Sequence, residues 1–201
     1  MNLIYPDFAA QMHEKDFDLN GVLRVLKNEG VILLPTDTVW SLACDAIDVE
    51  AVKRLRELKA SEDPFHFEIL TDSVQMLKSA IRHLHPRLET LLLYHNRPLS
   101  VVIEKKDLSP GYFPLNPSFL TFRVVKDPYC YALIRTFGKP LLSTAAAQGN
   151  DPFPASFSEV SKAVLRSVDY TVKASDRSQD LGELSVMVKL SPRDELIFLR
   201  E

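Results

Sequence analysis

The sequence predicts an α/β fold in which a mixed sheet is flanked by helices within a single domain spanning residues 1–201. Segments with the apolar spacing of helices alternate irregularly with short apolar or alternating segments that are typical of strands. The chain has 201 residues, of which 46% are apolar and 25% charged, which suits one globular domain with a substantial core. No repeat, low-complexity tract or Gly/Ser linker divides the sequence.

The first part of the chain contains signals for a helix, a strand and a second helix. A helix that ends at Gly30 is predicted by apolar residues at i, i+3, i+4 and i+7, which are Leu19, Val22, Leu23 and Leu26. The apolar run 31–34 predicts a buried strand. Asp48 then begins a helix with two distinct faces. Its apolar face carries Ala51, Leu55 and Leu58, and its solvent face carries Lys53, Arg54 and Arg56.

The rest of the chain continues the alternation. Strands are predicted at 66–70 and 99–103, and a helix at 72–82. The segment 119–125 alternates like a strand, with Leu120, Phe122 and Val124 on one face and Thr121, Arg123 and Val125 on the other. Asp127 and Pro128 begin a helix that ends at Gly138. The last predicted elements are strand 139–143, helix 157–166, and strands 185–190 and 196–199.

Charge and composition exclude several classes of protein. The formal net charge of −3 gives no global attraction for nucleic acid. Cys44 and Cys130 are too few for a disulfide framework or a zinc site, and their apolar surroundings predict buried thiols. The histidines show no metal-binding spacing, so we expect no protein metal site. No apolar run is as long as a membrane span, and the charged N-terminus is unlike a signal peptide. We expect a soluble, cytoplasmic protein.

Polar residues at the ends of buried elements are the candidate ligand contacts, because open α/β sheets bind ligands beyond their strand ends. Three segments stand out. Segment 36–38 follows the first strand, segment 59–63 lies at the end of a helix, and segment 143–147 follows another strand. Their hydroxyl groups and exposed backbone N–H groups suit phosphate oxygens or an amino-acid carboxylate.

Each of these features also has a purely structural interpretation. Thr36 and Asp37 suit a turn in which the side chains bond local backbone. Lys59 favours the C-terminal end of a helix without any ligand. Arg123 lies mid-strand, where a guanidinium calls for a ligand anion, a buried carboxylate or a salt bridge to a neighbouring helix. The residues alone therefore predict a small anionic ligand near the strand ends and nothing more specific.

Two ordered motifs resemble those of a known family. The run PTDTVWSLACDAIDVEAVKRLRELK at 35–59 is similar to P-T-D-T-V-Y-G-L-x-C-D and the following helix ending in K-x-R, which mark the YrdC-like threonylcarbamoyl-AMP synthase family. The run RVVKDPYCYALIRTFGKPLLSTAAA at 123–147 resembles the family's later motif, which ends in S-T-S-A-N. The likeness extends from about residue 17 to 200, leaving 1–16 as an N-terminal extension. It implies a twisted, open mixed sheet flanked by helices around a concave cavity.

The resemblance also implies an activity. Family members condense ATP, L-threonine and bicarbonate into threonylcarbamoyl-AMP and pyrophosphate, the first stage of making N6-threonylcarbamoyladenosine in tRNA. Carboxylated threonine attacks the α-phosphorus of ATP, which is mainly a problem of positioning and charge neutralisation. Mg²⁺ would travel with the ATP. The implied further partners are tRNA or double-stranded RNA, bound weakly, and tRNA-modification proteins.

Site residues follow from the resemblance, position by position. Thr36 and Thr38 would line the threonine and nucleotide pocket, with Trp40 where the family has tyrosine. Lys59, at the first position of K-x-R, would contact phosphate. The remaining implied contacts to the nucleotide and its anion are Arg123, Ser143, Thr144 and Ser185.

Several family positions have changed. Ser61 stands at the arginine of K-x-R and Phe65 at the next basic position. Ala145 and Ala147 replace the second serine and the asparagine of S-T-S-A-N. Other departures are Ser41 in place of glycine, the acidic pair Glu62 and Asp63, and changes in the motifs at 95–98 and 185–189. These changes remove hydrogen-bond donors and positive charge, and Arg97 is a candidate replacement for that charge.

Two functions are consistent with this pattern. The chain is a divergent synthase with compensating changes, or it is a catalytically reduced paralog that binds a nucleotide, RNA or a protein. A third interpretation, other chemistry on the architecture shared with dihydroxybutanone-phosphate synthase, is disfavoured because that enzyme's acidic metal-site pattern is absent.

Overall fold

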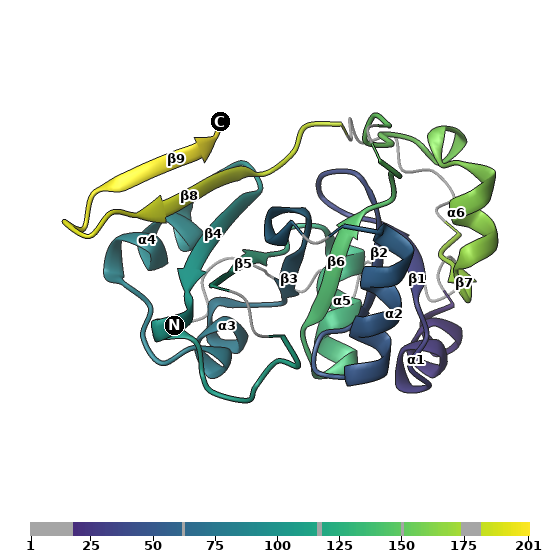
Figure 1. Cartoon of the computed structure of the whole chain (residues 1–201), viewed down its shortest axis with the longest axis horizontal. Helices are drawn as coiled ribbons and strands as arrows, with labels where there is room; N and C mark the ends of the chain where they lie inside the picture. Colours follow the sequence, from purple (N-terminus) through teal and green to yellow (C-terminus); the bar gives the residue numbers. More distant parts are fainter. Residues whose placement is uncertain (1–17, 62, 116–117, 150, 174–181) are drawn as a thin grey trace.

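The computed structural model describes residues 18–201 except 62, 116–117, 150 and 174–181 (Figure 1). Within this part of the chain, nine strands form one sheet in the order β7-β1-β2-β6-β3-β5-β4-β8-β9. The pairs β1/β7, β3/β5 and β4/β8 are parallel and the other pairs are antiparallel. The strands are β1 Ile32–Pro35, β2 Trp40–Asp45, β3 Glu68–Thr71, β4 Leu99–Glu104, β5 Phe119–Val124, β6 Leu141–Ala145, β7 Tyr170–Thr171, β8 Val186–Leu190 and β9 Leu196–Arg200.

Helices cover both faces of this sheet. Helices α1 and α5 pack on one face, and α2, α3, α4 and α6 pack on the other. The two faces alternate along each central strand, so that Leu33 joins the core under α2 and Leu34 joins the core under α5. The helices are α1 Leu19–Lys27, α2 Val49–Lys59, α3 Val74–Ala80, α4 Pro86–Tyr94, α5 Pro128–Phe137 and α6 Lys162–Ser167, with short 3₁₀ turns η2 Pro64–His66, η3 Lys105–Asp107 and η4 Phe157–Glu159. The predicted mixed sheet flanked by helices is confirmed.

The predicted helix boundaries have clear local causes. Asp48 and Asp127 cap α2 and α5, each accepting a hydrogen bond from a backbone N–H in the first turn. Gly138 ends α5 with a φ of 75°, a left-handed conformation that glycine adopts at little cost. Cys44 and Cys130 are both buried, as predicted.

Three elements were missing from the sequence prediction. Strand β2 is buried on both faces, so it lacks the alternation that marks a half-buried strand. Helix α4 begins at Pro86 after His85, a residue that is unusual as a helix cap. Strand β7 has only two residues, Tyr170 and Thr171. The single helix predicted at 157–166 was wrong, because Ser161 caps a separate helix after η4.

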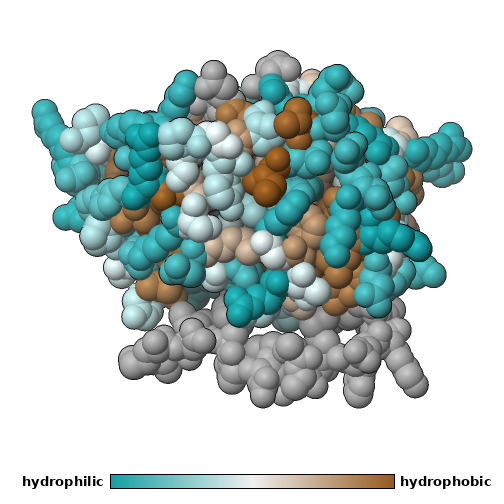
Figure 2. Space-filling view, turned by 90° about the horizontal axis from the view of Figure 1, so that it is seen from below, coloured by the Kyte–Doolittle hydropathy of each residue, from teal (hydrophilic) through white to brown (hydrophobic). Residues whose placement is uncertain are grey.

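The face shown in Figure 2 is largely hydrophilic, with hydrophobic side chains in several separate groups. None of the helices in the described ranges is long and apolar enough to cross a membrane. The predicted N-terminal extension, 1–16, lies outside the described residues.

Candidate functional site

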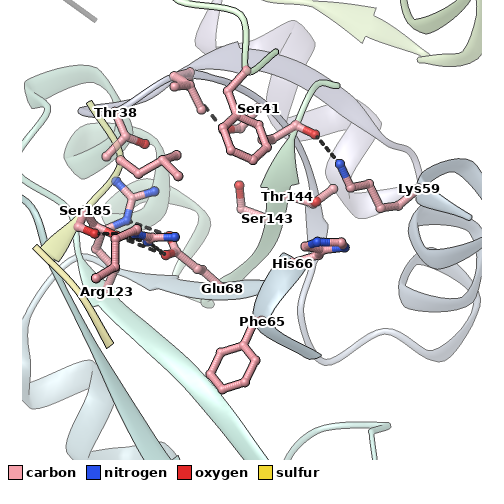
Figure 3. Close-up of a pocket in the computed structure, with 15 residues that line it drawn as sticks. Thr38, Ser41, Lys59, Phe65, His66, Glu68, Arg123, Ser143, Thr144 and Ser185 are labelled. Atoms are coloured by element: carbon pink, nitrogen blue, oxygen red, sulfur yellow. Dashed lines mark hydrogen bonds and ion pairs between the residues drawn. The ribbon is translucent and has the colours of Figure 1, made fainter. Parts of the chain in front are cut away.

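A pocket lies where the sheet meets the C-terminal end of α2. It contains about 530 Å³ of space, open solvent included. Six of the sequence-predicted residues line it, namely Thr38, Lys59, Arg123, Ser143, Thr144 and Ser185. In Figure 3, Arg123 and Ser185 lie on one side, Lys59 lies on the other, and Ser143 and Thr144 lie between them. The three segments singled out in the sequence therefore meet at one site.

Thr36 shapes the turn that presents Thr38. The Thr36 hydroxyl donates to the carbonyl oxygen of Val39 at 2.9 Å and accepts from the backbone N–H of Thr38 at 3.2 Å. Its oxygen also lies 3.0 Å from the Thr38 hydroxyl oxygen. Thr38 is among the residues that line the pocket, whereas Thr36 is not. For Thr36, the structural interpretation as a local turn is confirmed.

Trp40 does not line the pocket. Its strand neighbour Ser41 does, and successive side chains of a strand point to opposite faces. The Trp40 ring is buried in the core under α2 and lies against Phe157, with 5.2 Å between ring centroids. The structure therefore places Trp40 behind the wall of the pocket.

The strand register places several polar side chains on the face of the sheet that packs against α5. Arg123 is paired with Leu70 on β3 and with Ser100 on β4, so these side chains share a face. Glu68, two residues before Leu70, has Ser143 of β6 as its partner on that face. Leu70 belongs to the core under α5, so the face changes from apolar to polar within one strand.

Arg123 is buried between two carboxylates. Its Nε donates to Oε2 of Glu68 at 2.9 Å, and its Nη1 pairs with Oδ1 of Asp37. Only 2% of the Arg123 side chain is exposed. Burial lowers the pKa of this guanidinium, but Asp37 and Glu68 outweigh it and the pKa lies above its ordinary value. Three partners were predicted for Arg123: a ligand anion, a buried carboxylate or a neighbouring helix. The structure confirms the buried carboxylate.

Asp37 therefore does more than form a turn. Its second carboxylate oxygen accepts the backbone N–H of Lys126 at 3.1 Å. The loop between β1 and β2 is thereby fastened to the end of β5, which positions Thr38 beside Arg123. The interpretation of Asp37 as a residue that bonds only local backbone was wrong, because both of its partners are distant in sequence.

Glu68 also binds the opposite side of the pocket. Its Oε1 accepts from the hydroxyls of Ser100 at 2.8 Å and Ser185 at 3.1 Å. Arg200 lies 3.5 Å from the same oxygen and donates to the Ser185 hydroxyl at 2.8 Å. Burial alone would raise the pKa of Glu68, but Arg123, Ser100 and Arg200 lower it below its ordinary value. Glu68 is thus an ionised carboxylate that lines the pocket.

Lys59 is held by backbone carbonyl groups. Its Nζ donates to the carbonyl oxygens of Ala147 at 2.7 Å and Ala145 at 3.2 Å. Burial lowers the pKa of the ammonium group. Ala60, which follows it, ends α2 with a φ of 50°. Lys59 therefore fastens the end of α2 to the segment after β6, and carbonyl oxygens occupy two of its three donor positions.

Thr144, which lines the pocket, carries a buried hydroxyl. Its Oγ1 is buried and has no hydrogen-bond partner among the described residues. An unsatisfied buried hydroxyl costs free energy, so a ligand atom or an ordered water beside it would be favourable. Among the predicted site residues, Thr144 is the one with a fully buried side-chain oxygen that has no partner within the described part of the chain.

The changed family positions divide into two sets: Ser41, Phe65 and Ala145 line the pocket, whereas Ser61, Asp63 and Ala147 do not. Ser61 bonds Nδ1 of His66 at 2.6 Å, and Asp63 accepts from the backbone N–H of Phe65, so Asp63 caps η2 and does not line the pocket. Glu62 lies outside the described residues. Arg97 pairs with Glu183 on the surface and does not replace the missing positive charge.

Sequence reasoning missed two charged residues that line the pocket, Glu68 and Arg200. A signal existed for Glu68, since it is a carboxylate within the apolar run of a predicted strand. Arg200 closes the last strand and gave no comparable signal. No group of three or more His, Cys, Asp or Glu among the described residues is arranged to hold a metal ion.

Comparison with known proteins identifies the family. The sequence model of the Sua5/YciO/YrdC family, described as "Telomere recombination", matches residues 24–201. The chain belongs to this family. A threonylcarbamoyl-AMP synthase from Xanthomonas axonopodis pv. citri is 30% identical over 158 residues, which cover 77% of this chain and 84% of that protein. The predicted resemblance is confirmed.

Solved structures of Sua5/YciO/YrdC proteins show the same fold. Sua5 from P. abyssi complexed with L-threonine aligns with a TM-score of 0.73 and 20% identity over 90% of this chain. This chain spans about half of that Sua5 chain, 53% of its length. YciO from E. coli aligns with a TM-score of 0.72 and 21% identity, covering 91% of this chain and 88% of YciO.

Proposed function

We propose that the chain binds ATP, L-threonine and bicarbonate in this pocket and forms threonylcarbamoyl-AMP and pyrophosphate. The observation that carries the proposal is the meeting of Thr38, Lys59, Ser143 and Thr144 in one pocket, with the Thr144 hydroxyl still unsatisfied. A relative named threonylcarbamoyl-AMP synthase, matched over most of its length, supports it. The proposal keeps the cytoplasmic location predicted from the sequence.

The side chains suit a reaction between anions. The carbamate formed from threonine and bicarbonate attacks the α-phosphorus, the bond to the β,γ-phosphates breaks, and pyrophosphate leaves. Mg²⁺ bound to ATP would neutralise part of the phosphate charge. Thr38, Ser143 and Thr144 would donate to carboxylate or phosphate oxygens, and Lys59 has one donor position left. Fixing the reactants side by side would supply much of the rate enhancement.

The test is pyrophosphate release from purified protein with ATP, bicarbonate and L-threonine. We expect release that requires both L-threonine and bicarbonate, and that falls when Lys59 is replaced by alanine. Lys53→Ala, on the solvent face of the same helix, is the matched control. Absence of release, at protein concentrations where the Xanthomonas relative is plainly active, would refute the synthase activity.

A catalytically reduced paralog is the second candidate, and one specific observation favours it. The cations that line the pocket are already engaged: Arg123 and Arg200 by Glu68, and Lys59 by carbonyl groups. Little positive charge is left to neutralise a transition-state phosphate, and losing one such contact typically costs about a hundredfold in rate. Binding of nucleotide and L-threonine in calorimetry, without pyrophosphate release, would identify this second function.

RNA binding by the solvent face of α2 is a separate proposal. Arg54 on this face forms a bidentate ion pair with Asp169, at 2.6 and 2.9 Å, which reduces its availability to a phosphate. We therefore expect at most weak binding of tRNA or double-stranded RNA, with a shallow dependence on salt. A gel-shift titration at two salt concentrations, comparing the wild type with Lys53→Glu, tests this.

A further inference from the structure

We propose that Glu68 sets the ligand charge that the pocket accepts, so that the pocket prefers an adenosine monophosphate group, as AMP or an AMP ester, over a triphosphate. The inference rests on the proposed function, because it assumes that an adenine nucleotide binds in this pocket. It adds a residue that selects the form of that nucleotide, and Glu68 lies outside the motifs that the resemblance matched.

Glu68 stands where an anionic ligand would meet it. It lines the same pocket as Thr38, Lys59 and Thr144, and 16% of its side chain remains exposed. Arg123 and the hydroxyls of Ser100 and Ser185 hold its carboxylate. In Figure 3, Glu68 lies beside Arg123 and Ser185. Because these donors favour the charged form, a negative charge is fixed there at neutral pH.

The Glu68 carboxylate pairs with the two arginines that would otherwise be available to bind a polyphosphate. Arg123 contacts Glu68 and Asp37, and Arg200 contacts Glu68 and Ser185. The remaining cation that the structure shows inside the pocket wall, Lys59, is bound by two carbonyl oxygens. The pocket and the residues directly behind it thus carry three fixed cations, Lys59, Arg123 and Arg200, and two fixed anions, Glu68 and Asp37.

Such a near balance favours a ligand of low negative charge. Each added phosphate group brings more negative charge toward the Glu68 carboxylate without meeting a free guanidinium. A threonylcarbamoyl-adenylate carries one phosphate, and ATP carries three. The pocket is therefore expected to hold the adenylate product more tightly than the ATP substrate, which would slow turnover by slow product release.

Calorimetric titration of the full chain with AMP and with ATP, each without and with Mg²⁺, tests the inference. The wild type should bind AMP more tightly than ATP. Glu68→Gln, which keeps the size of the side chain and removes its charge, should raise ATP affinity about tenfold relative to AMP affinity. Glu104→Gln is the matched control, since Glu104 is an exposed carboxylate that pairs with Lys106 outside the pocket.

A second variant makes the test independent of one substitution. Arg200→Gln removes a partly exposed cation and should lower ATP affinity more than AMP affinity, opposite to Glu68→Gln. Circular dichroism establishes that each variant is folded. Equal affinities of the wild type for AMP and ATP, or an unchanged affinity ratio in both variants, would overturn the inference and leave the nucleotide site in place. Failure of the wild type to bind either nucleotide would instead refute the proposed site, and with it this inference.

Discussion

Glu68 and Arg123, on the neighbouring parallel strands β3 and β5, are joined by a 2.9 Å bond from Nε to Oε2. The ion pair is buried, and it links the Asp37 turn on one side to Ser100, Ser185 and Arg200 on the other. Breaking such a pair by removing one partner is strongly destabilising, because the other charge stays buried without compensation. The pair is therefore a structural requirement of the fold as well as a feature of the pocket.

Arg123→Met should destabilise the fold markedly. The substitution removes the cation between the carboxylates of Asp37 and Glu68, and we expect a loss of about 3–5 kcal/mol in the free energy of unfolding. Urea unfolding followed by circular dichroism measures it. Arg97→Met, which removes an exposed arginine paired with Glu183, should have little effect, and similar losses in both variants would contradict the role given to Arg123.

Acid should remove the stabilising effect of Glu68. Its pKa in the folded protein lies below the ordinary value of 4.5, so this carboxylate contributes stability that is fully present above that pH and is lost as the pH falls through the folded-state pKa. The stability advantage of wild type over Glu68→Gln should be largest near neutral pH and shrink on acidification below 4.5. Thermal melts of both proteins at several pH values measure this, and a difference that does not vary with pH would show that Glu68 is not ionised in the fold.

Ligand binding should depend on Thr38 and Lys59. Thr38→Val removes a hydroxyl and Lys59→Ala removes an ammonium group from the pocket wall, and each should weaken L-threonine or nucleotide binding by roughly tenfold. Isothermal titration calorimetry is the measurement. Thr90→Val, which changes a threonine on α4 away from the pocket, is the control for Thr38→Val, and Lys53→Ala is the control for Lys59→Ala. Unchanged binding in both pocket variants would place the ligand elsewhere.

Ala60→Gly should stabilise the chain. Ala60 ends α2 with a φ of 50°, where a Cβ atom is strained and glycine is not, so we expect a gain of about 1 kcal/mol. Gly138→Ala introduces the opposite change at the end of α5, where φ is 75°, and should cost a similar amount. Melting temperatures of the two variants should therefore move in opposite directions, and a shift in the same direction would contradict the reading of both helix ends.

Much of this fold was predictable because the decisive signals are local. Asp48, Asp127 and Gly138 mark helix ends through their own chemistry, and the alternation around Arg123 marks a strand. Strand β2 was not predictable in this way, because burial on both faces removes the alternation.

The same distinction between local signals and long-range contacts applies to the residues of the site. Thr38, Lys59, Ser143 and Thr144 follow or end local elements, and the structure brings them together in one pocket. Glu68 and Arg200 were missed because their contact depends on the pairing of distant strands, which sequence spacing does not encode. Trp40 was placed in the pocket by resemblance, whereas strand alternation directs its ring into the core.

Backbone amide chemical shifts recorded during titration with L-threonine and AMP would locate the ligand on the chain itself. We predict that the shifts concentrate at Thr38, Ser41, Lys59, Ser143, Thr144 and Ser185, the residues of the pocket beside Glu68. Shifts that concentrate instead at the second pocket, which Arg82, Lys105 and Leu120 line, would contradict the site, as would no shifts at all.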